Sequence, residues 1–268
     1  MPYPERIVCL TEEPTEVLYA LGEEDRIVGI SNFTVRPERA RKEKPRVSAF
    51  TSAHIDRILA LEPDLVVGFS DIQADIARDL IRAGVEVWIS NHRTVDGILG
   101  YVRRLGAMVG AAAAADEFAR ELERHVADVR RAADALPYRP RVYFEEWHDP
   151  LITGIGWVAE LIRIAGGEDV FPELSAHSLA KDRIIAGPAE VVARSPEVIL
   201  ASWCGKKVQF GHIYRRAGWE QVPAIAQELV FEIDSSIVLQ PGPAALTDGL
   251  DELHRLVAHS VEVLGRGG

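Results

Sequence analysis

The segment EEWHDP holds the densest group of side chains that could do chemistry: Glu145, Glu146, His148 and Asp149. Carboxylates and an imidazole can bind a metal ion or exchange protons with a ligand. In a strand, successive side chains point to opposite faces, so Glu146 and His148 could converge on one side. No second His and no Cys stands at ligand spacing, so we interpret the segment as a strand end held by carboxylates and predict no metal site. Glu146 and His148 stay candidates for contact with a ligand.

Motifs for catalysis are absent from the sequence. It contains no GxSxG, HExxH or GxxxxGK[ST] motif, and no GxGxxG that follows a strand. Cys9 and Cys204 stand far apart without a partner motif, so neither a disulfide nor a zinc site is predicted, and two thiols suit a reducing compartment. We therefore predict a binding protein with no catalytic residue.

Charge and composition exclude several classes of protein. The 268 residues carry 30 Lys and Arg against 41 Asp and Glu, and this formal net charge of -11 has the wrong sign for binding phosphates of nucleic acids. The basic run at residues 36–46 is interrupted by Glu38 and Glu43 and lacks aromatic residues, so it predicts a solvated loop or short helix. No window approaches the ~18 consecutive apolar residues of a membrane helix, so insertion into a membrane is not expected.

The elements that would position these residues alternate between short apolar runs and longer segments of helical period. This alternation is typical of βαβ units and predicts an α/β fold with mostly parallel sheets. Residues 95–136 contain helix formers only, so one or two long helices are expected before the alternation resumes at residue 141. The predicted strands are residues 6–10, 26–30, 65–69, 85–89, 141–145, 198–201 and 229–233, and the predicted helices of the first half are residues 14–21, 55–61 and 72–83.

An internal repeat supports two related lobes. IDRILALEPDLVVGFSD, from Ile55, aligns with PAEVVARSPEVILASWC, from Pro188, and pairs Pro63 with Pro196. Each copy predicts a helix, a proline turn and a strand. Ligands of open α/β sheets bind at the carboxyl ends of the strands, so the cleft between the lobes is the expected site.

Two tryptophans follow predicted strands directly. Trp147 and Trp203 come where the chain leaves the sheet, so we interpret them as residues of the cleft rather than of the core. Trp88, Trp157 and Trp219 lie within predicted elements and are interpreted as packing residues.

Five segments carry a resemblance to a known family: RIVCLTEEPTEVLYALG, RVSAFTSAHIDRILALEPDLVVGFSDIQ, PLITGIGWVAELIRIAGGEDVFPE, DRIIAGPAEVVARSPEVILASWCGKK and LQPGPAALTDGLDEL. Through them the chain resembles the substrate-binding proteins of cobalamin and iron-siderophore ABC importers, the helical-backbone metal receptors, and most closely the cobalamin-binding branch. The resemblance implies two lobes, each with a mostly parallel sheet flanked by helices, joined by one long rigid helix. We expect an N-terminal lobe at residues 1–111, a linking helix at 112–136 and a C-terminal lobe at 137–268.

The resemblance also implies a ligand and a set of contacts. It predicts that the protein binds cobalamin or a related corrinoid between the lobes, without catalysis and without a resident cofactor. A corrin has broad apolar faces and a rim of amides, which suit aromatic rings and polar partners. Together with Glu146, the residues expected to contact the ligand are Phe33, Phe50, Phe69, Asp71, Gln73, Trp147, His148, Trp203 and Cys204.

Two features of this chain depart from the transport members of the family. No secretory signal precedes Cys9, which stands inside the first predicted strand. Where those members present an acidic residue on each lobe to the permease, this chain has Asp71 and Asp75 in one lobe but Lys206 and Lys207 in the other. Both departures favour a cytoplasmic protein for storage, delivery or sensing, or a periplasmic one if a leader has been removed. Partnership with an ABC permease stays open.

Alternative functions stay open as well. The same scaffold carries haem, siderophores and other chelates in the family. An enzyme acting on a tetrapyrrole, with His148, Glu146 and Cys204 as metal contacts, is the rival from another class. A third possibility is an interaction module whose cleft is filled by side chains.

Overall fold

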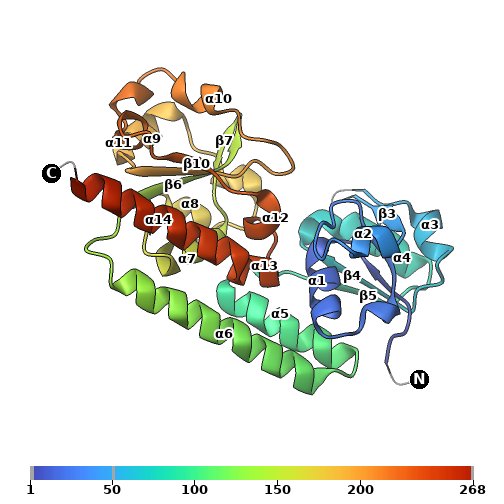
Figure 1. The fold of residues 1–268 in the computed structure, drawn as a ribbon. Coiled ribbons are helices and arrows are strands. Elements are labelled where there is room, and N and C mark those ends of the chain that lie inside the picture. The colour runs from blue at the N-terminus through green and yellow to red at the C-terminus, as the bar shows by residue number, and fades with distance from the viewer. Residues whose placement is uncertain (1–2, 50–51, 267–268) are drawn as a thin grey trace. The chain divides into compact units, whose positions relative to one another are not determined.

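The N-terminal half of the chain folds around a five-stranded sheet in which neighbouring strands are parallel, in the order β3-β2-β1-β4-β5 (Figure 1). The strands are β1 (Ile7–Cys9), β2 (Ile27–Ser31), β3 (Arg46–Ser48), β4 (Leu65–Phe69) and β5 (Val87–Ser90). The central strands β1 and β4 are buried along their length, as continuous apolar strands of a parallel sheet are. The chain adds β2 and β3 on one side of β1, and β4 and β5 on the other. The switch point of this sheet therefore lies between β1 and β4.

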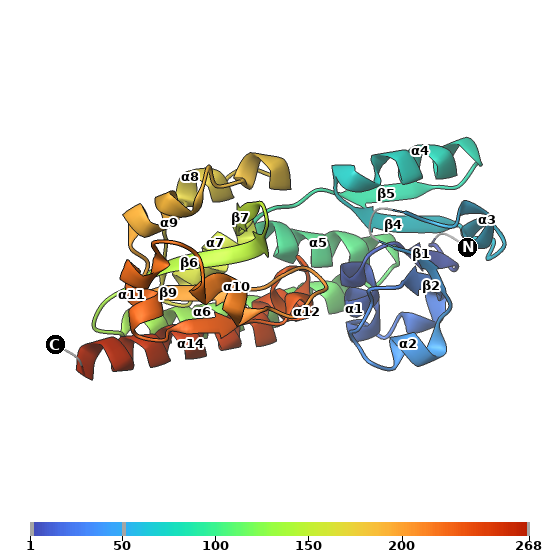
Figure 2. The same ribbon diagram turned by 90° about the horizontal axis from the view of Figure 1, so that it is seen from above.

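Short helices connect these strands. The connecting helices are α1 (Glu12–Ala20), α2 (Ala40–Glu43), α3 (Ile55–Leu59) and α4 (Ala74–Arg82), and a longer helix, α5 (Val95–Met108), follows β5. α1 packs on β1 and β2, and α4 lies beside the edge strand β5 (Figure 2). Val8, Leu10, Ile58, Val66 and Leu80 are members of the core between helices and sheet. The basic run at residues 36–46 contains the short helix α2 and leads into β3, a strand that the sequence did not predict.

The structure is a computed structural model that describes residues 3–49 and 52–266, and the chain divides into two compact units. The first unit comprises the described residues up to His92, with Asp96–Glu123 and Pro241–Pro243; the second comprises Arg93–Val95, Arg124–Gln240 and the described residues from Ala244 on. The predicted long helix is α6 (Ala112–Asp134), and its contacts assign it partly to each unit. The division at residues 111 and 137 stays a prediction.

The second unit contains another five-stranded sheet, in which β10-β9-β6-β7 are neighbours and β8 pairs with β6. Its strands are β6 (Arg141–His148), β7 (Leu151–Thr153), β8 (Glu168–Asp169), β9 (Val198–Ala201) and β10 (Val230–Glu232). All pairs are parallel except β6 and β7, which form an antiparallel hairpin. The sequence missed β7 and β8, and β6 runs on to His148 because its polar end pairs with β7.

The helices of the second unit cover this sheet. They are α7 (Gly156–Ile164), α8 (Pro172–Ser175), α9 (Pro188–Arg194), α10 (Phe210–Tyr214), α11 (Pro223–Ala226), α12 (Ser235–Val238), α13 (Pro243–Leu246) and α14 (Asp248–Arg266). Figure 2 shows the sheet between α9 on one side and α14 on the other. α14 buries Leu250, Leu253 and Val257, the spacing of one helix face. The repeat is also present, because α3 and β4 correspond to α9 and β9.

The three tryptophans interpreted as packing residues do pack. The Trp157 indole N–H donates to the Val238 carbonyl at 3.0 Å, and that of Trp219 donates to the Pro188 carbonyl at 3.2 Å. Trp88 is half-buried and stacks on Tyr101 with 5.3 Å between ring centroids. None of the helices in the described ranges combines the length and apolar character needed to cross a bilayer.

Candidate ligand-binding edges of the two sheets

At the switch point of the first sheet, the Gln73 side chain joins the loops that follow β1 and β4. Its carbonyl oxygen accepts from the Phe69 N–H at 3.0 Å, and its amide nitrogen donates to the Leu10 carbonyl at 3.4 Å. Gln73 is fully buried. Its amide group holds the two loops together in this structure, and its predicted contact with the ligand stays a prediction.

The loop after β4 contains a strained residue. Ser70 has φ 74°, in the left-handed region that non-glycine residues seldom adopt, and its Oγ accepts from the Ile72 N–H at 3.3 Å. Asp71, which follows it, is exposed at the carboxyl edge of the sheet. Its predicted ligand contact stays a prediction.

The predicted aromatic contacts of the first unit differ in exposure. Phe33 is 48% exposed just after β2, where a ligand could reach it. Phe69 is only 6% exposed and packs against the His92 ring, with 5.1 Å between centroids, so the structure places it in the core instead of on the edge. Phe50 lies outside the described residues.

Glu13 is a buried acid beside the switch point. It is 1% exposed, and neither of its carboxyl oxygens has a hydrogen-bond partner among the described residues. Burial raises its pKa to about 7. Gly242 packs on it so closely that a Cβ there would lie 3.2 Å from the Cβ of Glu13. The sequence gave no signal for a role of Glu13, since its burial depends on this distant segment.

In the second unit, Glu145 is the centre of a buried polar network. Its carboxylate accepts two hydrogen bonds from the Arg216 guanidinium, at 2.5 and 2.9 Å. It also accepts from the Trp203 indole N–H at 3.1 Å and from the Tyr143 hydroxyl at 3.2 Å. Glu145 is 0% exposed, so the network compensates a charge that is entirely removed from water.

A β-bulge at Glu146 changes the order in which the side chains of Glu145, Glu146 and His148 alternate between the two faces of the sheet. The ladder between β6 and β7 pairs Glu145 with Thr153 and Trp147 with Ile152, so Glu146 is an additional residue. The Arg183 guanidinium binds its carboxylate at 2.6 and 2.9 Å. The bulge interrupts the alternation of faces, and the expected convergence of Glu146 and His148 is therefore wrong.

His148 instead belongs to a group of four rings, which we call the aromatic platform: Trp147, His148, Trp203 and His212. The His148 ring lies 4.2 Å from Trp203 and 5.3 Å from both Trp147 and His212, between centroids. Burial and the nearby His212 lower the pKa of His148, which favours a neutral imidazole at neutral pH. A neutral imidazole can accept a hydrogen bond or bind a metal centre. The sequence gave no signal for His212, which reaches the platform from α10.

The members of the platform are not equally accessible. Trp147 is half-buried, and the Lys206 ammonium lies 4.7 Å from its ring centroid. Trp203 is 2% exposed and belongs to the core of the unit, so its interpretation as a residue of the cleft instead of the core is wrong. The reason is that the indole N–H of Trp203 donates to the Glu145 carboxylate and the His148 ring packs against the indole ring. Cys204, the next residue, is exposed.

The positions of these side chains bear on the alternative hypothesis, a metal-dependent enzyme that acts on a tetrapyrrole. In the described parts of the chain, no three His, Cys, Asp or Glu side chains gather as a metal site would require. Glu146 is bound by Arg183, whereas His148 packs on Trp203. The metal contacts that the enzyme hypothesis needs are therefore not brought together.

Comparisons with known proteins place this geometry in context. Residues 7–237 match the family described as periplasmic binding protein. A vitamin B12-binding protein of Vibrio campbellii is 28% identical over 246 residues, covering 88% of this chain and 84% of that protein. The structure of the periplasmic heme-binding protein RhuT from Roseiflexus sp. RS-1 has a TM-score of 0.83 and 22% identity, covering 96% of this chain and 99% of that one. For the periplasmic vitamin B12-binding protein BtuF of Vibrio cholerae, the TM-score is 0.77, the identity 21% and the coverage 96% and 98%.

The two solved structures confirm the predicted fold class: two lobes with mostly parallel sheets flanked by helices. The predicted cytoplasmic location finds no support, because both of those proteins are named as periplasmic.

Proposed function

The chain belongs to the periplasmic binding protein family, and from that premise we propose that it binds cobalamin or a related corrinoid and performs no catalysis on it. The vitamin B12-binding relative supports this ligand, since it matches along most of both chains. The predicted cleft between the lobes stays a prediction. The bound corrinoid would be handed on to a partner, for which an ABC permease is the candidate.

The observation that carries the proposal is the aromatic platform. Trp147 and His148 offer a half-buried surface of two uncharged rings, in which His148 packs on the buried Trp203 and the Lys206 ammonium lies beside Trp147. A flat, apolar macrocycle can stack on such a surface, while its peripheral amides reach the polar side chains around it. The neutral His148 imidazole also suits coordination of a cobalt centre whose lower axial base has dissociated.

The second candidate ligand is haem. Either of two neighbouring imidazoles, those of His148 and His212 with 5.3 Å between their centroids, could bind haem iron. The heme-binding protein RhuT has the same fold, which is why this candidate is tested together with the first.

The test is an absorption titration of the purified protein with cobalamin, with haem and with a ferric siderophore. We expect saturable binding of cobalamin and a spectral shift to the base-off form. The His148→Ala variant should lose that shift, whereas His177→Ala, which removes an exposed imidazole of the same unit, should keep it. Saturation by haem alone would replace the corrinoid by the second candidate, and saturation by none of the three would overturn the proposal.

A further inference from the structure

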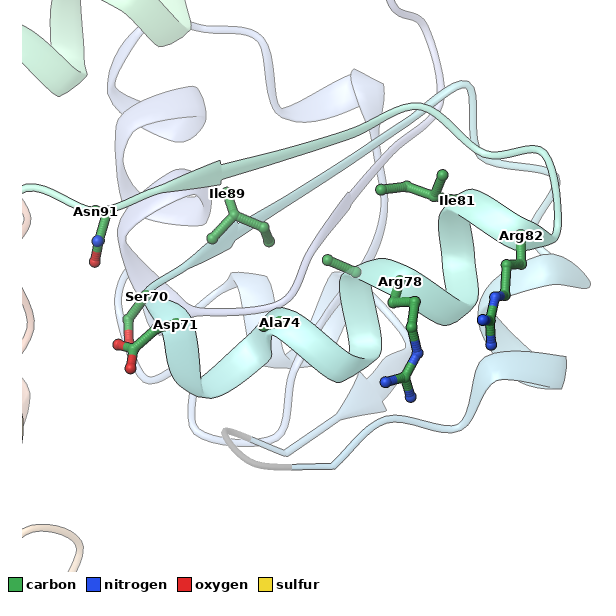
Figure 3. A pocket seen from close by; sticks show the side chains of 9 residues that line it. Ser70, Asp71, Ala74, Arg78, Ile81, Arg82, Ile89 and Asn91 are labelled. Atoms are coloured by element: carbon green, nitrogen blue, oxygen red, sulfur yellow. The ribbon is translucent and has the colours of Figure 1, made fainter.

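A groove with a volume of about 650 Å³ runs along the outside of the N-terminal unit, between α4 and the edge strand β5 (Figure 3). All of its lining residues belong to this unit: Ser70, Asp71, Ala74, Ala77, Arg78, Ile81, Arg82, Ile89 and Asn91. Its volume is that of a site for a small molecule or for one arm of a larger one.

One face of α4 forms the length of the groove. Ala74, Ala77 and Ile81 recur at helical spacing along it, while Ile76 and Leu80 are buried in the core on the other face. The small alanines leave room above the helix, and Ile81 is 60% exposed although it is a large apolar residue. The groove is therefore apolar along its length.

The charges at the two ends of the groove differ. Arg78 is compensated by Asp75 at 2.6 Å and Asp79 at 3.3 Å. Arg82 is exposed and has no ion pair or hydrogen-bond partner within the described ranges, so it is the uncompensated cation of the groove. The carboxylate of Asp71 stands at the opposite end, beyond Ala74 (Figure 3).

The end marked by Ser70, Asp71 and Asn91 follows β4 and β5, at the carboxyl edge where ligands of such sheets bind. From Ala74 to Arg82 the helix rises about 12 Å, at about 1.5 Å per residue. We propose that the groove receives one arm of the bound ligand, and that this arm packs on the apolar face of α4 and carries a phosphate or carboxylate that pairs with Arg82. The inference rests on the proposed function and names the part of the ligand that is recognised.

Corrinoids allow this to be tested, because cobalamin carries a phosphodiester in its nucleotide arm, whereas cobinamide lacks the phosphate, the ribose and the base of that arm. The experiment measures the dissociation constants of both corrinoids, at low salt, for the wild type and for Arg82→Glu. We expect Arg82→Glu to weaken cobalamin binding about fivefold, the effect of a partly exposed charge pair, and to leave cobinamide binding unchanged. Arg57→Glu reverses an exposed charge on α3 of the same unit and should change neither constant.

The outcomes separate the two claims. If the wild type binds both corrinoids and Arg82→Glu weakens them equally or not at all, the groove does not recognise the arm, while the proposed function stands. If the wild type binds neither corrinoid, the proposed function fails and the groove proposal fails with it. The cobalamin effect should also shrink as ionic strength rises, because the pair is exposed to screening.

Discussion

The carboxyl edges of the two sheets are built in opposite ways. In the second unit, the buried carboxylate of Glu145 is fully paired, and through Trp203 it supports the ring of His148. In the first unit, the buried carboxyl of Glu13 has no hydrogen-bond partner among the described residues, and the loops are held by the uncharged amide of Gln73. The contrast is that the aromatic platform is supported by a fully paired carboxylate, whereas the first edge contains an acid whose pKa is raised by burial to about 7.

The largest effect should come from removing the Glu145 carboxylate, which pairs with Arg216 at the edge of the second sheet. Glu145→Ala leaves Arg216 without its partner in a site where the arginine side chain is 12% exposed, and this should lower the free energy of unfolding by about 3 to 5 kcal/mol. Urea denaturation followed by tryptophan fluorescence measures the loss. Asp128→Ala, which breaks an exposed pair with Arg131, is the control and should leave the midpoint unchanged. A loss from Glu145→Ala no larger than that of the control would show that the network does not stabilise the edge.

The stability of the protein should depend on pH through Glu13, the buried acid at the edge of the first sheet. Glu13 has a pKa of about 7 in the folded protein against 4.5 unfolded, so its folded state retains the proton and stability falls as pH rises from 4.5 through 7. Between pH 5 and pH 8 this should cost the wild type about 2 to 3 kcal/mol relative to Glu13→Gln, at about 1.36 kcal/mol per pKa unit. Denaturation midpoints across this range provide the measurement.

The control for this comparison is Glu121→Gln, whose carboxylate is exposed on α6. It should follow the pH dependence of the wild type. Parallel pH curves for the wild type and Glu13→Gln would mean that the buried acid finds a compensating partner in solution.

On the platform, Trp147→Ala should act on binding. Loss of a packed aromatic contact commonly costs about 2 kcal/mol at a hot spot, or roughly thirtyfold in affinity, and Trp147 is the accessible indole of the platform. Corrinoid dissociation constants from absorption titration measure this effect, and the far-UV circular dichroism should not change. Wild-type affinity in the variant would exclude Trp147 from the site.

Phe33→Ala should give the smallest effect. Because Phe33 is 48% exposed, its removal should leave the melting temperature unchanged and weaken corrinoid binding by only about threefold, within the range of near-neutral interface contacts. Phe210→Ala, an aromatic residue 37% exposed on α10, serves as the control for surface truncation. If Phe33→Ala lowers the melting temperature without changing affinity, the ring has a structural role.

The strands that the sequence predicted best are those whose apolar runs are continuous. β4 and β9 match their predicted limits, because buried parallel strands leave a clear apolar signal. β7 and β8 have only a few residues each, too few to show a period. Their positions depend on pairing with β6, which no local pattern encodes.

The candidate site was harder to predict because its arrangement depends on distant partners. Arg216, which neutralises Glu145, stands 71 residues away in the sequence. The bulge at Glu146 changes which face His148 occupies, and strict alternation could not reveal it. Trp203 was expected in the cleft because it follows a strand, but the network around Glu145 buries it in the core.

The most direct test of the central claim is the shift in melting temperature of the wild-type protein with cobalamin, haem and a ferric siderophore, each at saturating concentration. A ligand at 100 times its dissociation constant stabilises the folded state by about 2.7 kcal/mol. We predict a clear upward shift with cobalamin that exceeds the shifts with haem and the ferric siderophore. No shift with cobalamin, or a larger shift with either of the other two, would contradict it.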